Sequence, residues 1–147
     1  MPDDLDHVRR LAGEDSLAVA ATTRRDGTIH ASLVNAGVLA HPTTGRQCVA
    51  FVAVGGAVKL QHLRRSGRAC LTFRHGLDWA SVEGPVDLAG PADTLDGFGG
   101  ERLPRLLRDI FTAAGGTHED WDTYDRVMAE EGRTAVLIDP ARITSNG

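Results

Sequence analysis

A strand, a glycine pair and a short helix follow one another in the middle of the chain, and this order constrains the fold most. The apolar run at 48–54 stops at Gly55 and Gly56, and a second apolar run occupies residues 68–73. Residues 57–65 between them have the pattern of a short helix. Because the first turn of a helix has unpaired backbone N–H groups, the segment brings several donors to one point.

This segment has the features of a phosphate site. Gly55 and Gly56 have no side chains, so a ligand can approach the main chain closely. The start of a helix has a partial positive charge that suits a phosphate, and Lys59 in the same turn adds a full charge. The sequence therefore predicts that a small-molecule cofactor is anchored here by its phosphate. The alternative is an ordinary strand–turn–helix connection with a solvated lysine.

Length and charge restrict the class of protein. The 147 residues fit a single domain, 1–147, and the composition is 41% apolar and 24% charged. A net charge of −4 argues against a nucleic-acid partner, which requires a basic face. No apolar run approaches the roughly 20 residues of a membrane helix, and the polar N-terminus does not resemble a secretory signal. We expect a cytoplasmic protein without a membrane partner, in which Cys48 and Cys70 are reduced thiols.

Short turns join the predicted strands. Asp26-Gly27 indicates a hairpin, and similar polar or glycine-containing turns separate most of the other segments. These short antiparallel connections favour a small barrel over a doubly wound sheet. Helices are predicted around residues 5–12 and 104–111, and from Thr117 onward. The predicted strands are 17–22, 28–39, 47–54, 68–73, 79–89 and, as the final strand, 133–138.

Basic residues cluster in sequence near the predicted phosphate site. Arg64, Arg65, Arg68 and Arg74 follow Lys59 within a short stretch of an otherwise acidic chain. Such a local positive patch indicates a small anionic ligand. Arginine binds carboxylates with two parallel hydrogen bonds, so the cluster would suit a ligand with an anionic tail beyond its phosphate.

No catalytic group stands out in the sequence, and the catalytic residues stay unassigned. The serines lack a nucleophile-elbow context, no metal-ligand spacing links the histidines, and the Walker and Rossmann motifs are absent. We therefore predict no metal site. An anion site without acid–base groups suits a cofactor that performs the chemistry itself, such as a flavin. Two residues are substrate-side candidates: Trp79 by stacking, with packing in the barrel as the alternative, and His75 by reaching a neighbouring subunit's pocket.

Four stretches together carry a family resemblance, and they cover most of the chain: RRDGTIHASLV, GGAVKLQHLRRSGRACLTF, DWASVEGPVDL and GGTHEDWDTYDRVMAEEGRTAVLI. In these stretches and their order, the chain resembles the flavin and deazaflavin oxidoreductases that have a pyridoxamine-phosphate-oxidase-like split β-barrel. The Trp-Asp-x-Tyr helix resembles the branch that binds the deazaflavin coenzyme F-420.

The resemblance implies a mainly β fold with peripheral helices: an antiparallel, FMN-binding-like split β-barrel. It also implies a homodimer with the cofactor at its interface. In the family, the lysine that matches Lys59 contacts the cofactor phosphate. Many relatives have Ser, Thr or Arg where this chain has an apolar residue at Val54 or Ala57, so we expect Lys59 and the backbone to contribute more. The other residues that match cofactor-lining positions are Ser32, Val34, Asn35, Val54, Gly55, Gly56 and Ala57.

The resemblance further implies an oxidoreductase that uses coenzyme F-420 to transfer a hydride to a small, planar, unsaturated substrate. One alternative is an FMN-dependent oxidase or reductase of the same fold. A second alternative is a non-catalytic protein that binds a cofactor or haem. Absorbance of the protein after exposure to each cofactor would separate these possibilities, because deazaflavin, flavin and haem have different bands.

Overall fold

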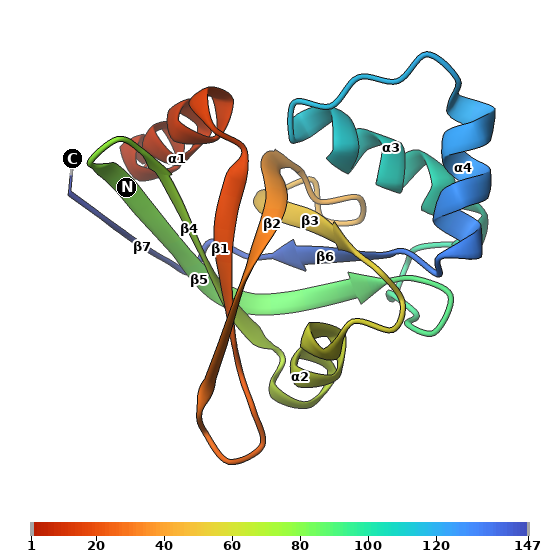
Figure 1. The fold of residues 1–147 in the computed structure, drawn as a ribbon, viewed down its shortest axis with the longest axis horizontal. Helices are drawn as coiled ribbons and strands as arrows, with labels where there is room; N and C mark the ends of the chain where they lie inside the picture. Colours follow the sequence, from red (N-terminus) through yellow and green to blue (C-terminus); the bar gives the residue numbers. More distant parts are fainter. Residues whose placement is uncertain (1, 147) are drawn as a thin grey trace.

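The computed structural model describes the backbone of residues 2–146 and the side chains of residues 5–146. Within this part of the chain, seven strands form one antiparallel sheet in the order β4-β1-β2-β3-β6-β5-β7. Because β5 also pairs with β4, the first six strands in that order close into a barrel, and β7 extends it along β5 (Figure 1). The strands are β1 (Leu17–Thr23), β2 (Ile29–Ala40), β3 (Gln47–Ala53), β4 (Arg68–His75), β5 (Asp78–Ala89), β6 (Thr134–Ile138) and β7 (Arg142–Ser145).

Strand β2 changes its partner halfway along its length. It pairs with β1 as far as Asn35 and with β3 from Ala36 onward. The barrel therefore divides into two halves at this point of β2, and Val34 and Asn35 lie where they meet. At the other end of β2, the predicted hairpin turn is present: Gly27 has a φ of 88°, and the carboxylate of Asp26 accepts a hydrogen bond from the Thr28 N–H at 3.0 Å.

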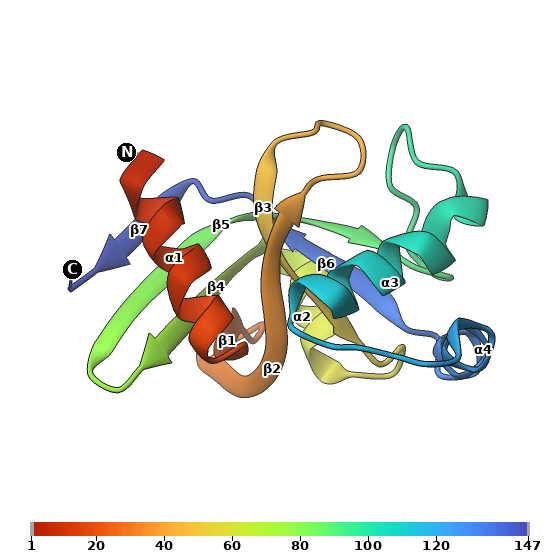
Figure 2. The same cartoon turned by 90° about the horizontal axis from the view of Figure 1, so that it is seen from above.

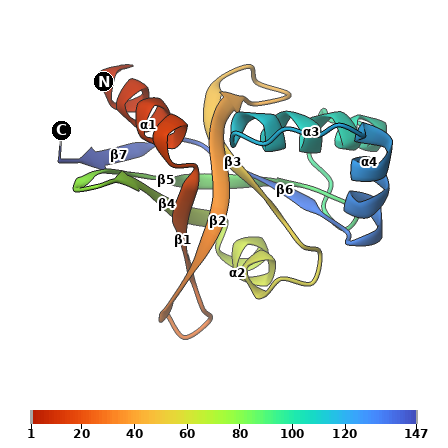
Figure 3. The ribbon, with the colours of Figure 1, turned by 45° about the horizontal axis from the view of Figure 1, so that its top comes forward.

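Two helices pack on opposite sides of the barrel strands (Figures 1 and 3). Helix α1 (Pro2–Glu14) contacts β2, β4 and β5, and helix α2 (Val58–Ser66) contacts β1. Their apolar faces join the barrel interior. The buried side chains of this core include Val8, Leu11, Leu60, Leu63, Phe51, Phe73, Leu71 and Val82.

A second apolar cluster covers the outside of β3 and β6. Helices α3 (Leu103–Ala113) and α4 (Trp121–Glu130) provide its outer layer, and Figure 2 shows α3 lying across the strands with α4 at its end. Gly37 of β2 allows the approach of α3, since a Cβ there would lie 2.4 Å from the backbone carbon of Ala113. The hydroxyl group of Tyr124 donates a hydrogen bond to the backbone oxygen of Leu107 at 3.1 Å and links the two helices.

The structure confirms the predicted antiparallel barrel with peripheral helices and corrects two of its details. Residues 133–138 are not the last strand, because β7 follows and pairs with β5. The helix expected from Thr117 begins at Trp121, after an N-cap at Asp120 whose carboxylate accepts a hydrogen bond from the Thr123 N–H at 3.1 Å. A short 3-10 turn, Gly100–Arg102, precedes α3. None of the helices within residues 2–146 is long and apolar enough to cross a membrane.

Candidate functional site

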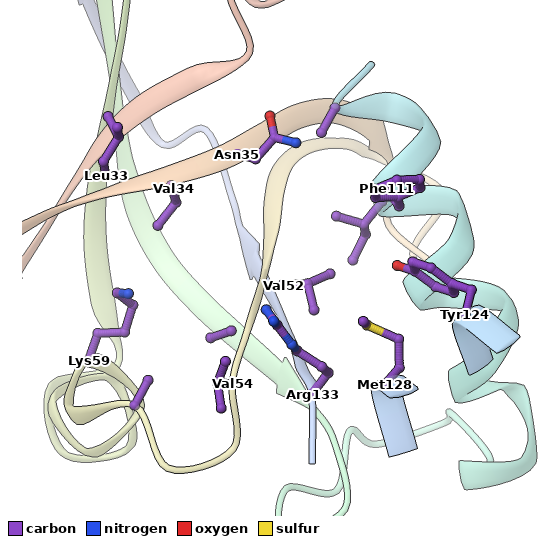
Figure 4. Close-up of a pocket in the computed structure, with 14 residues that line it drawn as sticks. Leu33, Val34, Asn35, Val52, Val54, Lys59, Phe111, Tyr124, Met128 and Arg133 are labelled. Atoms are coloured by element: carbon purple, nitrogen blue, oxygen red, sulfur yellow. The ribbon is translucent and has the colours of Figure 1, made fainter. Parts of the chain in front are cut away.

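A pocket of about 410 Å³ lies where the two halves of the barrel meet. Its walls come from the middle of β2, the end of β3, the start of α2, the helices α3 and α4, and the turn before β6 (Figure 4). Most of the lining is apolar, and two cationic side chains enter it. The lining residues are Leu33, Val34, Asn35, Val52, Ala53, Val54, Ala57, Lys59, Ile110, Phe111, Ala114, Tyr124, Met128 and Arg133.

The first turn of α2 is open at the pocket. Ala57 is its N-cap, with extended backbone angles, and no side chain caps the helix. The backbone N–H groups of Gly56, Val58 and Lys59 make no hydrogen bond with any described residue. The half-buried Lys59 has no carboxylate within 4.0 Å among the described side chains. Three backbone donors without a partner and one unpaired ammonium group therefore lie within one turn of the chain. Ala57 and Lys59 of this turn line the pocket, whereas Gly56 and Val58 do not.

The two glycines before α2 have different roles. The Gly55 N–H donates to the backbone oxygen of Glu131 at 3.0 Å, so it is not available to a ligand. A Cβ at Gly55 would lie 2.8 Å from the backbone oxygen of Gly132. Gly55 thus lets the end of β3 pack against the turn between α4 and β6. At Gly56 a Cβ would meet no atom within 4 Å, and its N–H remains free.

Strand β2 supplies two of its three predicted residues to the pocket. Val34 and Asn35 line it, whereas Ser32 does not. Ser32 shares a strand face with Val34 because the two are separated by one residue. The Ser32 hydroxyl group is buried and has no hydrogen-bond partner among the described residues. It is a polar atom without a partner on the strand face that continues into the pocket.

The four clustered arginines do not gather at the pocket, and the predicted basic patch is wrong. Arg64 binds Asp93 through two hydrogen bonds of 2.8 and 2.7 Å on the other side of α2. Arg65 donates to the backbone oxygen of Thr23, and Arg74 to that of Gly76. None of these three nor Arg68 lines the pocket. Neighbours in sequence diverge here because they lie on different faces of a helix and on a strand.

Arg133 is the second cation of the pocket, and the sequence analysis did not identify it. It lies directly before β6, and its Nε donates to the carboxylate of Glu131 at 2.8 Å. Figure 4 shows its guanidinium group directed toward the middle of the pocket, on the side of Val52. Its place in the site depends on how α4 and β6 pack against β3, which no local sequence pattern shows.

Helices α3 and α4 form the apolar wall of the pocket. Tyr124 and Met128 of α4 line it together with Phe111 of α3 (Figure 4). The aromatic rings of Phe111 and Tyr124 pack with centroids 5.0 Å apart. Trp121, Tyr124 and Met128 are three and four residues apart along α4, so they share one face of the helix. Trp121 packs against Phe111 without lining this pocket, whereas Tyr124 and Met128 belong to the same apolar cluster and also line the pocket.

The two substrate-side candidates lie elsewhere on the chain. Trp79 pairs with Arg74 in the β4–β5 hairpin, and His75 pairs with Asp78 at its tip. Neither residue lines the pocket of its own chain. Figure 1 shows this hairpin on the opposite side of the barrel from α3 and α4. A role for Trp79 or His75 at a substrate therefore requires a second subunit.

Solved structures share the fold of this chain, although no protein-family model and no curated protein sequence matches it. A conserved hypothetical protein from Mycobacterium tuberculosis is 19% identical with a TM-score of 0.68, covering 95% of this chain and 82% of that one. An FMN-binding protein related to pyridoxamine 5'-phosphate oxidase, from Nostoc punctiforme, is 11% identical with a TM-score of 0.63, covering 97% and 79%. An F420 reductase is 11% identical with a TM-score of 0.59, covering 88% and 89%.

These likenesses define the class of fold. The chain is a split β-barrel of the type found in FMN-binding proteins related to pyridoxamine 5'-phosphate oxidase. At identities of 11–19% the likeness extends to the fold alone. What the pocket binds has to be inferred from its own residues.

Proposed function

We propose that the protein is an oxidoreductase that binds a phosphate-bearing flavin or deazaflavin in this pocket. The observation that carries the proposal is the open first turn of α2, with Lys59 beside it, at one end of an apolar pocket. A helix start with free N–H groups and a lysine binds a phosphate. An apolar pocket with a few convergent polar groups suits the flat ring system that such a cofactor has.

The residues present fit such a ligand. The N–H groups of Gly56, Val58 and Lys59 and the ammonium group of Lys59 would hold the phosphate. The unpartnered hydroxyl group of Ser32 lies on the adjoining strand face and does not line the pocket, so we assign it no contact with the phosphate. The ring system would lie against the remaining apolar lining, which excludes water from one side of it. This lining includes Val34, Val52, Ala53, Phe111 and Met128.

When bound, the cofactor supplies hydride transfer, and the chain supplies position. The pocket walls orient the ring, and the phosphate site fixes its tail. The substrate proposed here is small, planar and unsaturated, because it has to lie parallel to the ring within reach of the hydride. No side chain is assigned as a proton donor.

Coenzyme F-420 is the proposed cofactor, and FMN is the alternative. Support for F-420 comes from α4, the helix whose sequence resembles the deazaflavin-binding branch, because its residues Tyr124 and Met128 line the pocket. The test is to titrate the protein with F-420, FMN and haem and to follow binding by absorbance and calorimetry. We expect F-420 to bind at least about tenfold more tightly than FMN, a difference of about 1.4 kcal/mol.

The ligand that binds most tightly in this titration assigns the protein to a class. Equal or tighter binding of FMN would assign the protein to the flavin enzymes of the same fold. Binding of haem alone would assign it to the non-catalytic binding proteins. Oxidation of reduced F-420 by a panel of small quinones and enones then tests for hydride transfer.

We also propose that two copies of the chain form a homodimer through the outer face of β1 and β2. This face, which we call the β1–β2 outer face, consists of Leu17, Val19, Ile29 and Leu33. Their exposed fractions range from 45% to 66%. Val19 and Leu33 lie directly opposite each other on the paired strands. Leu33 also lines the pocket, so the face is continuous with the candidate site and a second copy would cover both.

A further inference from the structure

The pocket has two cations, and they reach it from different elements. Lys59 comes from the start of α2, and Arg133 comes from the turn between α4 and β6 (Figure 4). A phosphate at the open helix start accounts for Lys59 alone. Arg133 has no role in the function proposed above, although its guanidinium group is directed into the same pocket.

The guanidinium group of Arg133 is held in place and is still free to bind. Its Nε donates to Glu131 at 2.8 Å, and the exposed fractions of the two side chains are 27% and 42%. Among the described residues, no acceptor bonds its two terminal nitrogens. One edge of the planar group is thus fixed by Glu131, while its end presents two parallel N–H donors.

The residues around Arg133 favour an organic anion over an inorganic one. Tyr124, Met128 and Val52 line the same part of the pocket and are apolar or aromatic. A hydrated inorganic ion gains nothing from such walls, whereas an organic acid can pack its body against them. Two parallel donors at the end of a guanidinium group match the two oxygens of a carboxylate.

We infer that the pocket binds a second anionic group, the carboxylate of an organic ligand, end-on at Arg133 and apart from the phosphate at Lys59. The inference rests on the proposed function for the phosphate end of the site. The carboxylate comes either from a cofactor tail that continues beyond the phosphate or from the substrate. In both cases Arg133 is a specificity-determining residue.

The test compares Arg133→Gln and Arg133→Lys with a matched control, Arg126→Gln. Arg126 lies on the exposed side of α4, is 66% exposed, and does not line the pocket, so its replacement changes the net charge equally without touching the site. Calorimetry would measure three ligands: F-420, which carries tail carboxylates, FMN, which carries none, and 2-naphthoate as a planar acid. The neutral 2-naphthamide is the control for naphthoate.

Two results would support the inference and identify the source of the carboxylate. If the cofactor tail supplies it, Arg133→Gln weakens F-420 binding by about tenfold or more and leaves FMN within about twofold. If the substrate supplies it, both cofactors bind as before, and naphthoate binding to the cofactor-loaded protein falls by about tenfold. Arg133→Lys retains the charge but loses the two parallel N–H donors, so its loss of affinity should be intermediate.

The inference is overturned if Arg133→Gln matches Arg126→Gln within about twofold for all three ligands. If neither cofactor binds the wild-type protein, the proposed function fails, and naphthoate alone decides the role of Arg133. Naphthoate binding to the cofactor-free protein that Arg133→Gln abolishes, and that naphthamide does not reproduce, would then support the carboxylate site. Absence of naphthoate binding would reject it.

Discussion

Lys59 provides the full positive charge of the proposed phosphate site. Replacing it with alanine removes a charge-assisted contact worth about 1.5–3 kcal/mol, so cofactor affinity should fall by roughly ten- to a hundredfold. Stability should change little, because a half-buried lysine without a carboxylate partner contributes little to folding. Calorimetric titration of Lys59→Ala, with Arg126→Ala as a charge-matched control, measures the effect. Unchanged affinity would assign Lys59 to the solvated surface.

We expect His62 to make the stability of the protein depend on pH. It is 9% exposed, its Nδ1 lies 2.9 Å from the hydroxyl oxygen of Thr22, and the ring of His30 lies 5.4 Å away. Burial, assisted by His30 and by the cations Arg24 and Arg65, holds the pKa of His62 below its ordinary value of 6.5. The neutral ring is therefore the form that the folded protein favours.

The sign of the effect follows from proton binding. Below pH 6.5 the unfolded chain protonates His62 before the folded chain does, so stability present above pH 6.5 is lost as the pH falls through the lowered folded pKa. Urea unfolding between about pH 5 and pH 8 should show this loss in the wild-type protein. His62→Gln should flatten the profile, whereas His75→Gln at the exposed hairpin tip should not. Parallel profiles for wild type and His62→Gln would contradict the prediction.

At the scale of elements, Gly55 joins the end of β3 to the turn between α4 and β6. In Gly55→Ala the new Cβ would lie 2.8 Å from the backbone oxygen of Gly132, so one element must move. We expect a loss of about 1–3 kcal/mol in the free energy of unfolding, as for other overpacked sites. Gly56→Ala is the matched control, since its Cβ would meet no atom within 4 Å. We expect it to change stability by less than about 0.5 kcal/mol.

The cofactor affinities of Gly55→Ala and Gly56→Ala test whether these two glycines matter for ligand binding. Gly55→Ala should weaken cofactor binding, because the displaced turn carries Arg133 and the displaced strand end carries Val54, and both line the pocket. If Gly55→Ala is as stable as the wild-type protein, the close approach of Gly132 does not require a glycine at position 55. Titration of both variants with the cofactor and urea unfolding supply the two measurements.

Local sequence patterns were enough to predict most of the strands. Apolar runs and the Asp26-Gly27 turn were enough for six strands, and β7 was missed because it contains one apolar residue, Ile143, and pairs only along the edge of β5. Val54, Ala57 and Lys59, which the sequence grouped together, line one pocket, because neighbours in a strand–turn–helix connection stay close together.

The far side of the pocket could not be predicted in this way. Arg133 reaches it only because α4 and β6 pack against β3, and that packing joins segments that are far apart in the chain. Conversely, Arg64 and Arg65 are adjacent in sequence, but adjacent residues of a helix point about 100° apart. One of them binds Asp93 and the other the backbone of Thr23.

At the scale of the whole molecule, the proposed second copy would explain features that one chain leaves open. The β1–β2 outer face exposes apolar side chains beside the pocket, and Leu33 belongs to both. Trp79 and His75 lie on a hairpin away from the pocket of their own chain. A dimer would cover the apolar face and the pocket beside it, and in such a dimer the hairpin of one copy could serve the pocket of the other.

Val19→Glu tests this arrangement, because Val19 lies on the β1–β2 outer face, is 45% exposed and does not line the pocket. Light scattering at micromolar concentration should give twice 15.7 kDa for the wild-type protein and a single 15.7 kDa chain for the variant. A carboxylate in a desolvated apolar interface has no partner, so association is lost while the barrel stays folded. Ala129→Glu on the exposed face of α4 adds the same charge and should remain dimeric. Cofactor affinity should fall in Val19→Glu, since the pocket loses its cover, and a wild-type monomer that binds the cofactor as tightly would refute the shared site.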